Sequence, residues 1–454
     1  MVGVSLSKWT MSYFAAALLA LLGAEVLMVT GFGFPSHGIA APETLVLVHL
    51  VAVGWLSLLM CGALIQFVPV LVAKPLVHPE LPAVALALLI AGLASLLAGF
   101  LRMAGLPVGS QPWLPLGAIC LTAGFVLNLW NLGRTLWTAR PIGLPARFVV
   151  AGLMSLAGVV SLGTIFSLAL GGWTTNPTLL RLTSEGIPLH AALGLGGWLT
   201  FTAMGVSYRL LAMFMLAPET EDRTSRIALL AGGASILALL VGGPLCLLLF
   251  GQGVTHPLVI SLALATVSLA FYGYDIIRLY RTRNRQRIEL NARMAAWALG
   301  GLGLATILLL LVTISGEIDR RIGAVVFLFA FGWLTGLGLA KLYKIVAFLT
   351  WLECYGALLG RRPTPRVQDL VDEPRALPWF WLYFACVGAA SLAAFLDGSL
   401  AFRIAALGIL VATASICRQL ISIRTLRSVP ALMLPDGAGA RPRLLLPKLQ
   451  QSQR

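Results

Sequence analysis

The sequence predicts an all-α integral membrane protein of about twelve transmembrane helices, built as three repeats of a four-helix unit. Three observations lead to this fold class: an apolar composition, apolar runs along the whole chain, and two motifs that recur with a common period. Of the 454 residues, 59% are hydrophobic and 11% are charged, whereas soluble domains carry about 25% charged residues. This composition excludes a water-soluble fold.

The apolar runs are roughly 20 residues or longer, which is enough for a helix to cross about 30 Å of hydrocarbon. They are unbroken and lack the alternation of a lipid-facing strand, so they predict helices rather than a barrel. The first run is too long for the apolar core of a signal peptide, and we expect it to be retained. The expected spans are 9–33, 43–73, 81–103, 112–138, 144–172, 187–217, 225–251, 256–281, 291–315, 321–351, 377–396 and 399–427.

Basic residues in the short loops predict the orientation of these spans. The segments after even-numbered spans are basic, whereas the loops on the other side hold few or no basic residues. Because cytoplasmic loops are rich in Lys and Arg, we expect both termini in the cytoplasm. As part of the leading hypothesis given below, we expect the chain in the inner (plasma) membrane of a bacterial cell. The basic residues are Arg134, Arg140 and Arg147 after the fourth span, Arg281, Arg283, Arg285, Arg287 and Arg293 after the eighth, Arg361, Arg362 and Arg366 after the tenth, and Arg427, Arg441, Arg443, Lys448 and Arg454 in the tail.

The formal net charge of +15 follows from this bias and from contact with anionic lipid head groups, so membrane lipids are expected partners and nucleic acid is not. The six cysteines form no C-x-x-C or C-x-x-C-H pair, which leaves a zinc ribbon and covalent haem attachment without support. No P-loop, G-x-S-x-G or H-E-x-x-H motif occurs either, so phosphate chemistry and hydrolysis are unsupported.

A Gly-Trp motif recurs in the second, sixth and tenth spans, with its tryptophans 143 and 135 residues apart. Glycine lets helices approach closely and tryptophan favours the membrane boundary, so a role in packing and in the aromatic belt is expected as well. Eleven residues after each tryptophan stands a long polar side chain that can reach the membrane surface: Gln66, Arg209 and Lys344. The three copies are Gly54-Trp55-Leu56-Ser57, Gly197-Trp198-Leu199-Thr200 and Gly332-Trp333-Leu334-Thr335.

An arginine anchor recurs near the ends of the fourth, eighth and twelfth spans, at Arg134, Arg278 and Arg424, with spacings of 144 and 146 residues. Asn131 and Asp275 precede the first two by one helical turn, so each pair can meet on one helix face, and we expect Asp275 to pair with Arg278. Two motifs with one period near 140 residues predict a repeat. Its units are 1–140, 141–287 and 288–427, followed by a basic, Pro-containing cytoplasmic tail over 428–454.

Three four-helix units around a pseudo-threefold axis, with both termini in the cytoplasm, resemble the catalytic subunit of heme-copper oxidases and nitric oxide reductases. His49, six residues before Trp55, looks like that family's second-helix histidine, an axial ligand of the low-spin haem. The resemblance implies the family's fold over the whole chain, haem b as cofactor, copper as a second candidate metal, and other respiratory or membrane subunits as partners.

Most of that family's metal ligands are missing. Its tenth helix supplies two haem-ligating histidines, but 321–351 contains none, and Phe327 stands where His49 stands relative to the Gly-Trp motif. Its copper site needs a sixth-helix histidine and a histidine pair between the seventh and eighth helices. Only His190 and, remotely, His256 are available here, and no His-His pair occurs. We therefore expect a divergent relative with a reduced cofactor set, or one that kept the fold and lost the haems.

His49 and His190 are the candidate haem-binding and metal-binding residues, because a b-type haem takes two axial imidazoles at similar depth. His49 stands six residues before its tryptophan and His190 eight before its own. At about 100° per residue they differ by roughly 160° around the helix, an offset that a bulge in Gly194–Gly197 would absorb. Uncharged interior histidines are the alternative. His37, His78 and His256 are expected in loops or at helix starts, as solvated or capping residues.

Glu25 is an acidic side chain well inside the first span. Ionisable groups at such depth are costly and suggest function. Three roles stay open: a proton relay, an ion pair with an arginine, and a protonated core residue.

The leading hypothesis is a haem-b-binding membrane protein in electron transfer or in haem, copper or nitric oxide handling, and not a complete oxidase. If it is an enzyme, it is an oxidoreductase. The alternatives are a twelve-helix solute transporter, whose usual repeat is six plus six, and a cofactor-free assembly or interaction subunit with the same fold.

Overall fold

The computed structural model describes residues 7–218, 221–361, 363–430, 433–435 and 442–446. Within these ranges every regular element is a helix, and twelve helical spans are long and apolar enough to cross a membrane. The all-α, multi-pass expectation is therefore confirmed. Among the basic residues from which the orientation was predicted, Arg362, Arg441, Lys448 and Arg454 lie outside the described part of the chain. Most of the 428–454 tail lies outside it as well. The spans are Thr10–Thr30, Pro42–Val72, Leu81–Met103, Trp113–Thr138, Leu144–Leu170, Ile187–Met215, Arg223–Leu248, Thr255–Arg281, Leu290–Ile314, Ile318–Leu358, Glu373–Phe395 and Ser399–Arg424.

Four of the spans change helix type along their length. A π-helical segment interrupts the second, sixth, seventh and tenth spans. Two short helices outside the spans were not expected from the sequence: α7 and the 3₁₀ helix η6. In chain order the elements are α1 (Thr10–Thr30), α2 (Pro42–His49), η1 (Leu50–Ser57), α3 (Leu58–Val72), α4 (Leu81–Met103), α5 (Trp113–Thr138), α6 (Leu144–Leu170), α7 (Pro177–Glu185), α8 (Ile187–Ala192), η2 (Leu193–Phe201), α9 (Thr202–Met215), α10 (Arg223–Leu237), η3 (Ala238–Gly242), α11 (Gly243–Leu248), α12 (Thr255–Arg281), α13 (Leu290–Ile314), α14 (Ile318–Phe327), η4 (Leu328–Thr335), α15 (Gly336–Tyr355), η5 (Gly356–Leu358), η6 (Val367–Leu370), α16 (Glu373–Phe395) and α17 (Ser399–Arg424).

Each Gly-Trp motif lies inside a π-helical segment: η1, η2 and η4 are π-helices, in which hydrogen bonds run from residue i to i+5. The three tryptophans, Trp55, Trp198 and Trp333, are fully buried. The expected belt position at the membrane boundary is therefore wrong. An indole that packs inside the protein contributes buried area and can satisfy its N–H there.

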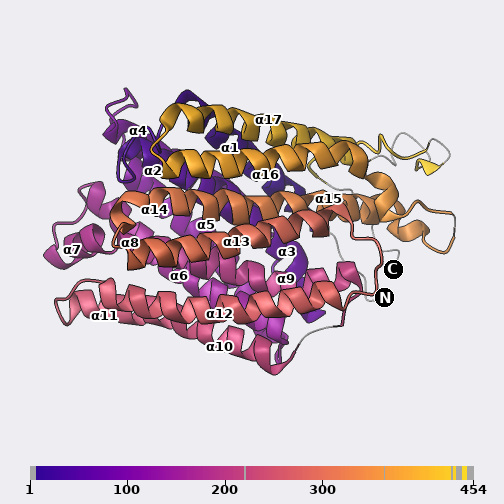
Figure 1. Cartoon of the computed structure of the whole chain (residues 1–454), viewed down its shortest axis with the longest axis horizontal. Helices are drawn as coiled ribbons and strands as arrows, with labels where there is room; N and C mark the ends of the chain where they lie inside the picture. The colour runs from indigo at the N-terminus through magenta and orange to yellow at the C-terminus, as the bar shows by residue number, and fades with distance from the viewer. Residues whose placement is uncertain (1–6, 219–220, 362, 431–432, 436–441, 447–454) are drawn as a thin grey trace. The chain divides into compact units, whose positions relative to one another are not determined.

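The chain divides into two compact units. The first comprises Gly3–Gly62 and Glu289–Arg454, and the second Ala63–Ile288, so the boundary falls within α3. In the first unit α17 packs against α16, α1 and α15, and α13 packs against α15 and η4. In the second unit α5 packs between α4 and α6, α6 contacts η2 and α9, and α10 lies beside α12 (Figure 1).

Polar bonds join the helices of the first unit. The indole N–H of Trp55 donates to the hydroxyl of Thr335 at 2.9 Å, so one Gly-Trp segment bonds to another. The Tyr383 hydroxyl donates to the carbonyl of Phe331 at 2.8 Å, which ties α16 to η4. Gly62 permits close approach of α1, because a Cβ there would lie 2.6 Å from the Cβ of Tyr13. Small residues at such crossings are typical of membrane helices.

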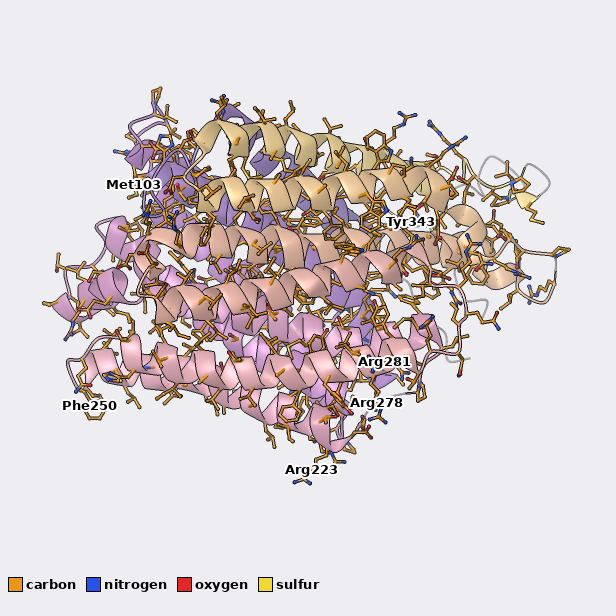
Figure 2. The ribbon with its side chains drawn as sticks, viewed as in Figure 1. Met103, Arg223, Phe250, Arg278, Arg281 and Tyr343 are labelled. Atoms are coloured by element: carbon orange, nitrogen blue, oxygen red, sulfur yellow. The ribbon has the colours of Figure 1, made fainter. Side chains whose placement is uncertain are left out.

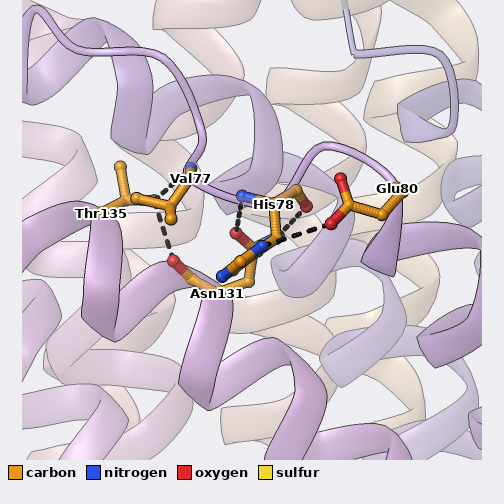
Figure 3. Close-up of polar contacts among 5 residues, drawn as sticks. All are labelled: Val77, His78, Glu80, Asn131 and Thr135. Carbon is orange, nitrogen blue, oxygen red and sulfur yellow. Dashed lines mark hydrogen bonds and ion pairs between the residues drawn. The ribbon is translucent and has the colours of Figure 1, made fainter.

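A loop of the second unit is held on the last turns of α5 (Figure 3). The Asn131 side chain accepts the backbone N–H of His78 at 3.1 Å and donates to the His78 carbonyl at 2.8 Å. The Thr135 hydroxyl accepts the backbone N–H of Val77 at 3.2 Å. Asn131 thus fixes the chain between α3 and α4, while Arg134 lies over the Trp130 ring, 5.5 Å from its centroid.

The expected Asp275–Arg278 pair is wrong. Asp275 is buried and accepts hydrogen bonds from the hydroxyls of Tyr208 at 2.8 Å and Thr224 at 2.5 Å. Arg278 is half exposed and pairs with Asp222, the residue before α10. Residues three apart share a helix face, but here the tertiary partners on α9 and α10 decide which contact each side chain makes.

Charge is asymmetric along the α10–α12 hairpin of the second unit. Figure 2 shows Arg223, Arg278 and Arg281 at one end of this hairpin and Phe250, whose side chain is exposed, at the other. The sequence shows the same asymmetry, with basic residues after the sixth and eighth spans and none in the loop 251–255.

A buried ion pair closes one end of the first unit. Arg424 of α17 donates to the Glu353 carboxylate at 2.9 Å, and both side chains are 4% exposed. Arg424 also donates to the Thr350 hydroxyl at 3.0 Å and to the carbonyl of Arg443. The arginine at the third anchor is therefore an interior residue that holds the chain after α17.

We predict that Arg424→Met lowers the free energy of unfolding by about 3–5 kcal/mol, because it leaves the Glu353 carboxylate buried without its cation. Denaturant unfolding of the purified protein in detergent, followed by circular dichroism, measures this. The double variant Arg424→Met/Glu353→Leu should recover much of the loss, and Arg427→Met, at an exposed position, should change stability by less than about 0.5 kcal/mol. Equal stability of Arg424→Met and wild type would contradict the assignment.

Candidate functional site

His49 is the last residue of α2 and directly precedes the π-helical segment η1. Its Nδ1 donates to the carbonyl of Leu45, one turn earlier, at 2.8 Å. This bond assigns the Nδ1–H tautomer and makes Nε2 the basic ring nitrogen. Metal-ligating histidines usually have this arrangement, with one ring nitrogen fixed by a carbonyl and the other directed at the metal.

His190 lies in α8, three residues before η2, and is half-buried. Its ring lies 5.6 Å from the Phe166 ring, centroid to centroid. A Cβ added at Gly163 would lie 3.1 Å from Cε1 of His190, so that glycine provides the space for the imidazole against α6. His190 is therefore placed by packing against its own unit.

A π-helical segment, η2, covers Gly194–Gly197, the stretch where a bulge would absorb the offset between the two histidines. A π-helical segment of the same kind covers Gly54 and Trp55 in the second span. Both spans contain such a segment, so it does not remove the difference of two residues between the histidines and their tryptophans. The angular offset of roughly 160° therefore remains. His49 and His190 thus take different positions on their helices relative to the motif, and they belong to different units.

Aromatic side chains fill the corresponding place in the tenth span. Phe327 is buried and stacks on Phe331, with centroids 4.7 Å apart and an interplanar angle of 20°. Phe402 of α17 meets it edge to face at 5.0 Å. The position that corresponds to His49 is therefore part of an apolar aromatic cluster in the first unit.

The other histidines lie where the sequence placed them. His37 and His78 are in loops, and His256 is in the first turn of α12. The His78 ring meets Glu80 at 3.2 Å (Figure 3). Among the described residues, no three His, Cys, Asp or Glu side chains are grouped closely enough to hold a metal ion.

Glu25 is fully buried in α1, and its Oε1 accepts a hydrogen bond from the Thr413 hydroxyl of α17 at 2.7 Å. Its Oε2 has no hydrogen-bond partner within the described part of the chain, and none of the described ion pairs includes it. An isolated charge at this depth is costly to bury. Of the three roles considered, the contact with Thr413 favours a hydrogen-bonded core residue.

Sequence reasoning missed Lys341, a buried lysine of α15 whose Nζ has no hydrogen-bond partner among the residues described. The sequence feature that could have identified Lys341 is its position three residues before Lys344, within an apolar run. Lys344 itself does not extend to the surface as expected: its Nζ pairs with Glu289 at 2.7 Å, and both side chains are 13% exposed.

Basic residues also gather at the end of the first unit that holds the start of α14. Arg320 and Arg321 pair with Asp397 at 2.9 and 3.1 Å, and Arg403 donates to the carbonyl of Val29 at 2.9 Å. The hydrogen bond from Arg320, with the charges of both arginines, holds the pKa of the Asp397 carboxyl below its usual range. These three arginines are bound to partners within the protein, so they count little against the orientation that the basic loops predict.

Comparison with known proteins supports the fold. No family model and no curated protein matches the chain. A chain of a heme-copper terminal oxidase dimer, solved by cryo-electron microscopy, matches with a TM-score of 0.57 and 12% sequence identity, over 94% of this chain and 85% of that chain. The chain therefore has a heme-copper-oxidase-like membrane fold, which confirms the resemblance at the level of architecture.

We predict that Glu25→Gln changes the free energy of unfolding by less than about 1 kcal/mol, because glutamine keeps the acceptor for Thr413 without a charge. Glu25→Ala should cost about 1–3 kcal/mol, the usual range for a buried polar partner left unsatisfied. Denaturant unfolding in detergent measures both, with Thr413→Val as the matched control on α17. A Gln variant destabilised as much as the Ala variant would show that the charge of Glu25, and not only its hydrogen bond to Thr413, contributes to stability.

Proposed function

We propose that this chain binds b-type haem, one or two groups at most, with His49 as an axial ligand. It then acts in electron transfer or in haem, copper or nitric oxide handling, in the inner membrane of a bacterial cell. The observation that carries this proposal is the Nδ1 bond of His49 to the Leu45 carbonyl at 2.8 Å, in a chain with a heme-copper-oxidase-like fold.

The residues at His49 fit a haem ligand. The carbonyl of Leu45 fixes the ring orientation, which leaves Nε2 as the ligating nitrogen. A bound b-type haem would supply a one-electron redox centre whose potential the axial ligands tune. His190, set against Gly163 and Phe166, is the second candidate ligand, and its different position on its helix favours a separate role from that of His49.

The proposal does not extend to a complete oxygen-reducing oxidase. The chain has no His-His pair, and Phe327, packed between Phe331 and Phe402, takes the tenth-span place where a histidine would be needed. If the protein catalyses a reaction, we propose an oxidoreductase. Copper is the other metal that this hypothesis includes, and respiratory or other membrane subunits are the proposed protein partners.

The repeat and the orientation are part of the same proposal. Units 1–140, 141–287 and 288–427 each have one π-helical Gly-Trp segment in their second span, which supports three four-helix repeats. The start of α1 and the chain after α17 meet in the first unit, where the Ser12 hydroxyl donates to the Leu445 carbonyl at 3.4 Å. This contact supports two termini on one side of the membrane, which the basic tail favours as the cytoplasm.

A cofactor-free assembly or interaction subunit is the second candidate function. The aromatic cluster of Phe327, Phe331 and Phe402 favours it, because these side chains occupy volume with apolar contacts where the family resemblance places a cofactor ligand. A solute transporter remains a further alternative, without a contact in the structure that favours it.

We predict that the protein, purified after haem-replete expression, has a Soret band and that His49→Ala removes most of it. His78→Ala, which changes a loop histidine, is the matched control and should leave the spectrum unchanged. His190→Ala reports separately on the second candidate ligand, and a metal assay on the same samples measures iron and copper. A folded wild-type protein with no Soret band would exclude the haem proposal in favour of the cofactor-free subunit.

We predict that a fluorescent reporter fused after residue 427 is active in the cytoplasm. An alkaline phosphatase reporter inserted in the loop 251–255 should be active in the periplasm, because that loop holds no basic residue. The same phosphatase inserted at 283–287, among the arginines after the eighth span, should be inactive. The reverse pattern of activities would overturn the orientation.

A further inference from the structure

A groove of about 930 Å³ in the second unit lies between the last turns of α5 and the first half of α6. Its walls include Leu136, Leu153 and Met154, and the loop that joins the two helices closes one end. The side chains of Met154 and Trp137 on its rim are more than half exposed. Both helices are candidate membrane spans, so the groove runs along segments that are long and apolar enough to cross hydrocarbon.

Two arginines stand at the loop end of the groove. The guanidinium carbon of Arg140 lies 3.6 Å from the centroid of the Trp137 ring, which is a close cation–π contact. The Nε of Arg147 donates to the carbonyl of Ile142 at 3.1 Å. Both side chains line the groove, and each contacts another residue that lines it. They lie at the end of the groove where α5 stops and α6 begins.

The floor of the groove includes Gly133, where an added Cβ would meet no heavy atom within 4 Å. Many other glycines in this unit have a neighbouring helix against them, as at Gly152, where a Cβ would lie 1.9 Å from the Thr202 hydroxyl. Gly133 therefore leaves this part of the groove open.

We propose that this groove binds one anionic phospholipid, with its phosphate at Arg140 and Arg147 and an acyl chain along Leu136, Gly133 and Met154. The shape and the charge both match this occupant: an apolar channel at hydrocarbon depth ends in two cations at the head-group level. Basic pockets between membrane helices on the cytoplasmic side attract anionic head groups. A peptide or a second protein chain would not need this alignment of apolar and cationic ends.

The test uses the full chain, purified in detergent, stripped of lipid and titrated with phosphatidylglycerol while native mass spectrometry counts the bound lipid. We expect one tightly held phosphatidylglycerol and weaker binding of zwitterionic phosphatidylcholine. Arg140→Gln/Arg147→Gln should weaken phosphatidylglycerol binding about 30-fold, since each arginine near an anionic head group contributes about fivefold. The double variant should also lose the preference over phosphatidylcholine.

Gly133→Phe should abolish the tight site by filling the groove, without a clash inside the unit. Gly273→Phe on α12 is its matched control, because a Cβ there also meets no heavy atom within 4 Å, and Arg281→Gln, at an exposed position of the same helix, is the control for charge. Both controls should bind as wild type does. The proposal is overturned if Gly133→Phe binds phosphatidylglycerol normally, if wild type does not discriminate between the two lipids, or if Gly133→Phe changes the oligomeric mass, which would identify a second copy of this chain as the occupant.

Discussion

The buried hydrogen bond from the Trp55 indole to the Thr335 hydroxyl, 2.9 Å long, shows the constraint on which the fold depends. In a bilayer a polar group without a partner is costly, and helix packing gains little from the hydrophobic effect alone. The Gly-Trp segment η1 meets this constraint, because the Trp55 indole fills the interior and its N–H donates to a hydroxyl on the Gly-Trp segment η4. The Tyr383 hydroxyl bonds to the same segment, η4, at the carbonyl of Phe331.

Composition and apolar runs predicted the twelve spans closely, because the thickness of the hydrocarbon fixes their length. They did not predict the π-helical segments, since a change of hydrogen-bond register from i+4 to i+5 leaves hydropathy unchanged. They also misplaced Trp55 at the membrane boundary, because residue type alone does not distinguish a boundary tryptophan from an interior one. The partners of Asp275 and Arg278 came from other helices and from the start of α10, which local spacing cannot identify.

The candidate site was less predictable than the fold, and for a related reason. His49 could be singled out by its distance from Trp55, but its bond to Leu45 depends on helical geometry that continues to the last residue of α2. The role of Glu25 depended on which helix faced it, and only the tertiary structure brings Thr413 to it. Lys341 lies within an apolar run, so the sequence alone did not single it out. Scaffold residues repeat along the chain and are therefore visible in one sequence, whereas single polar residues have no internal copy for comparison.

The π-helical segments also change the rotational phase within the second, sixth and tenth spans by a fixed amount, because each segment holds more residues per turn than an α-helix. His49 and Phe327 precede their segments, and the spans continue beyond them as α3 and α15. The same Gly-Trp scaffold thus follows an imidazole at His49 in one span and a phenyl ring at Phe327 in another, each one turn or more before the buried tryptophan.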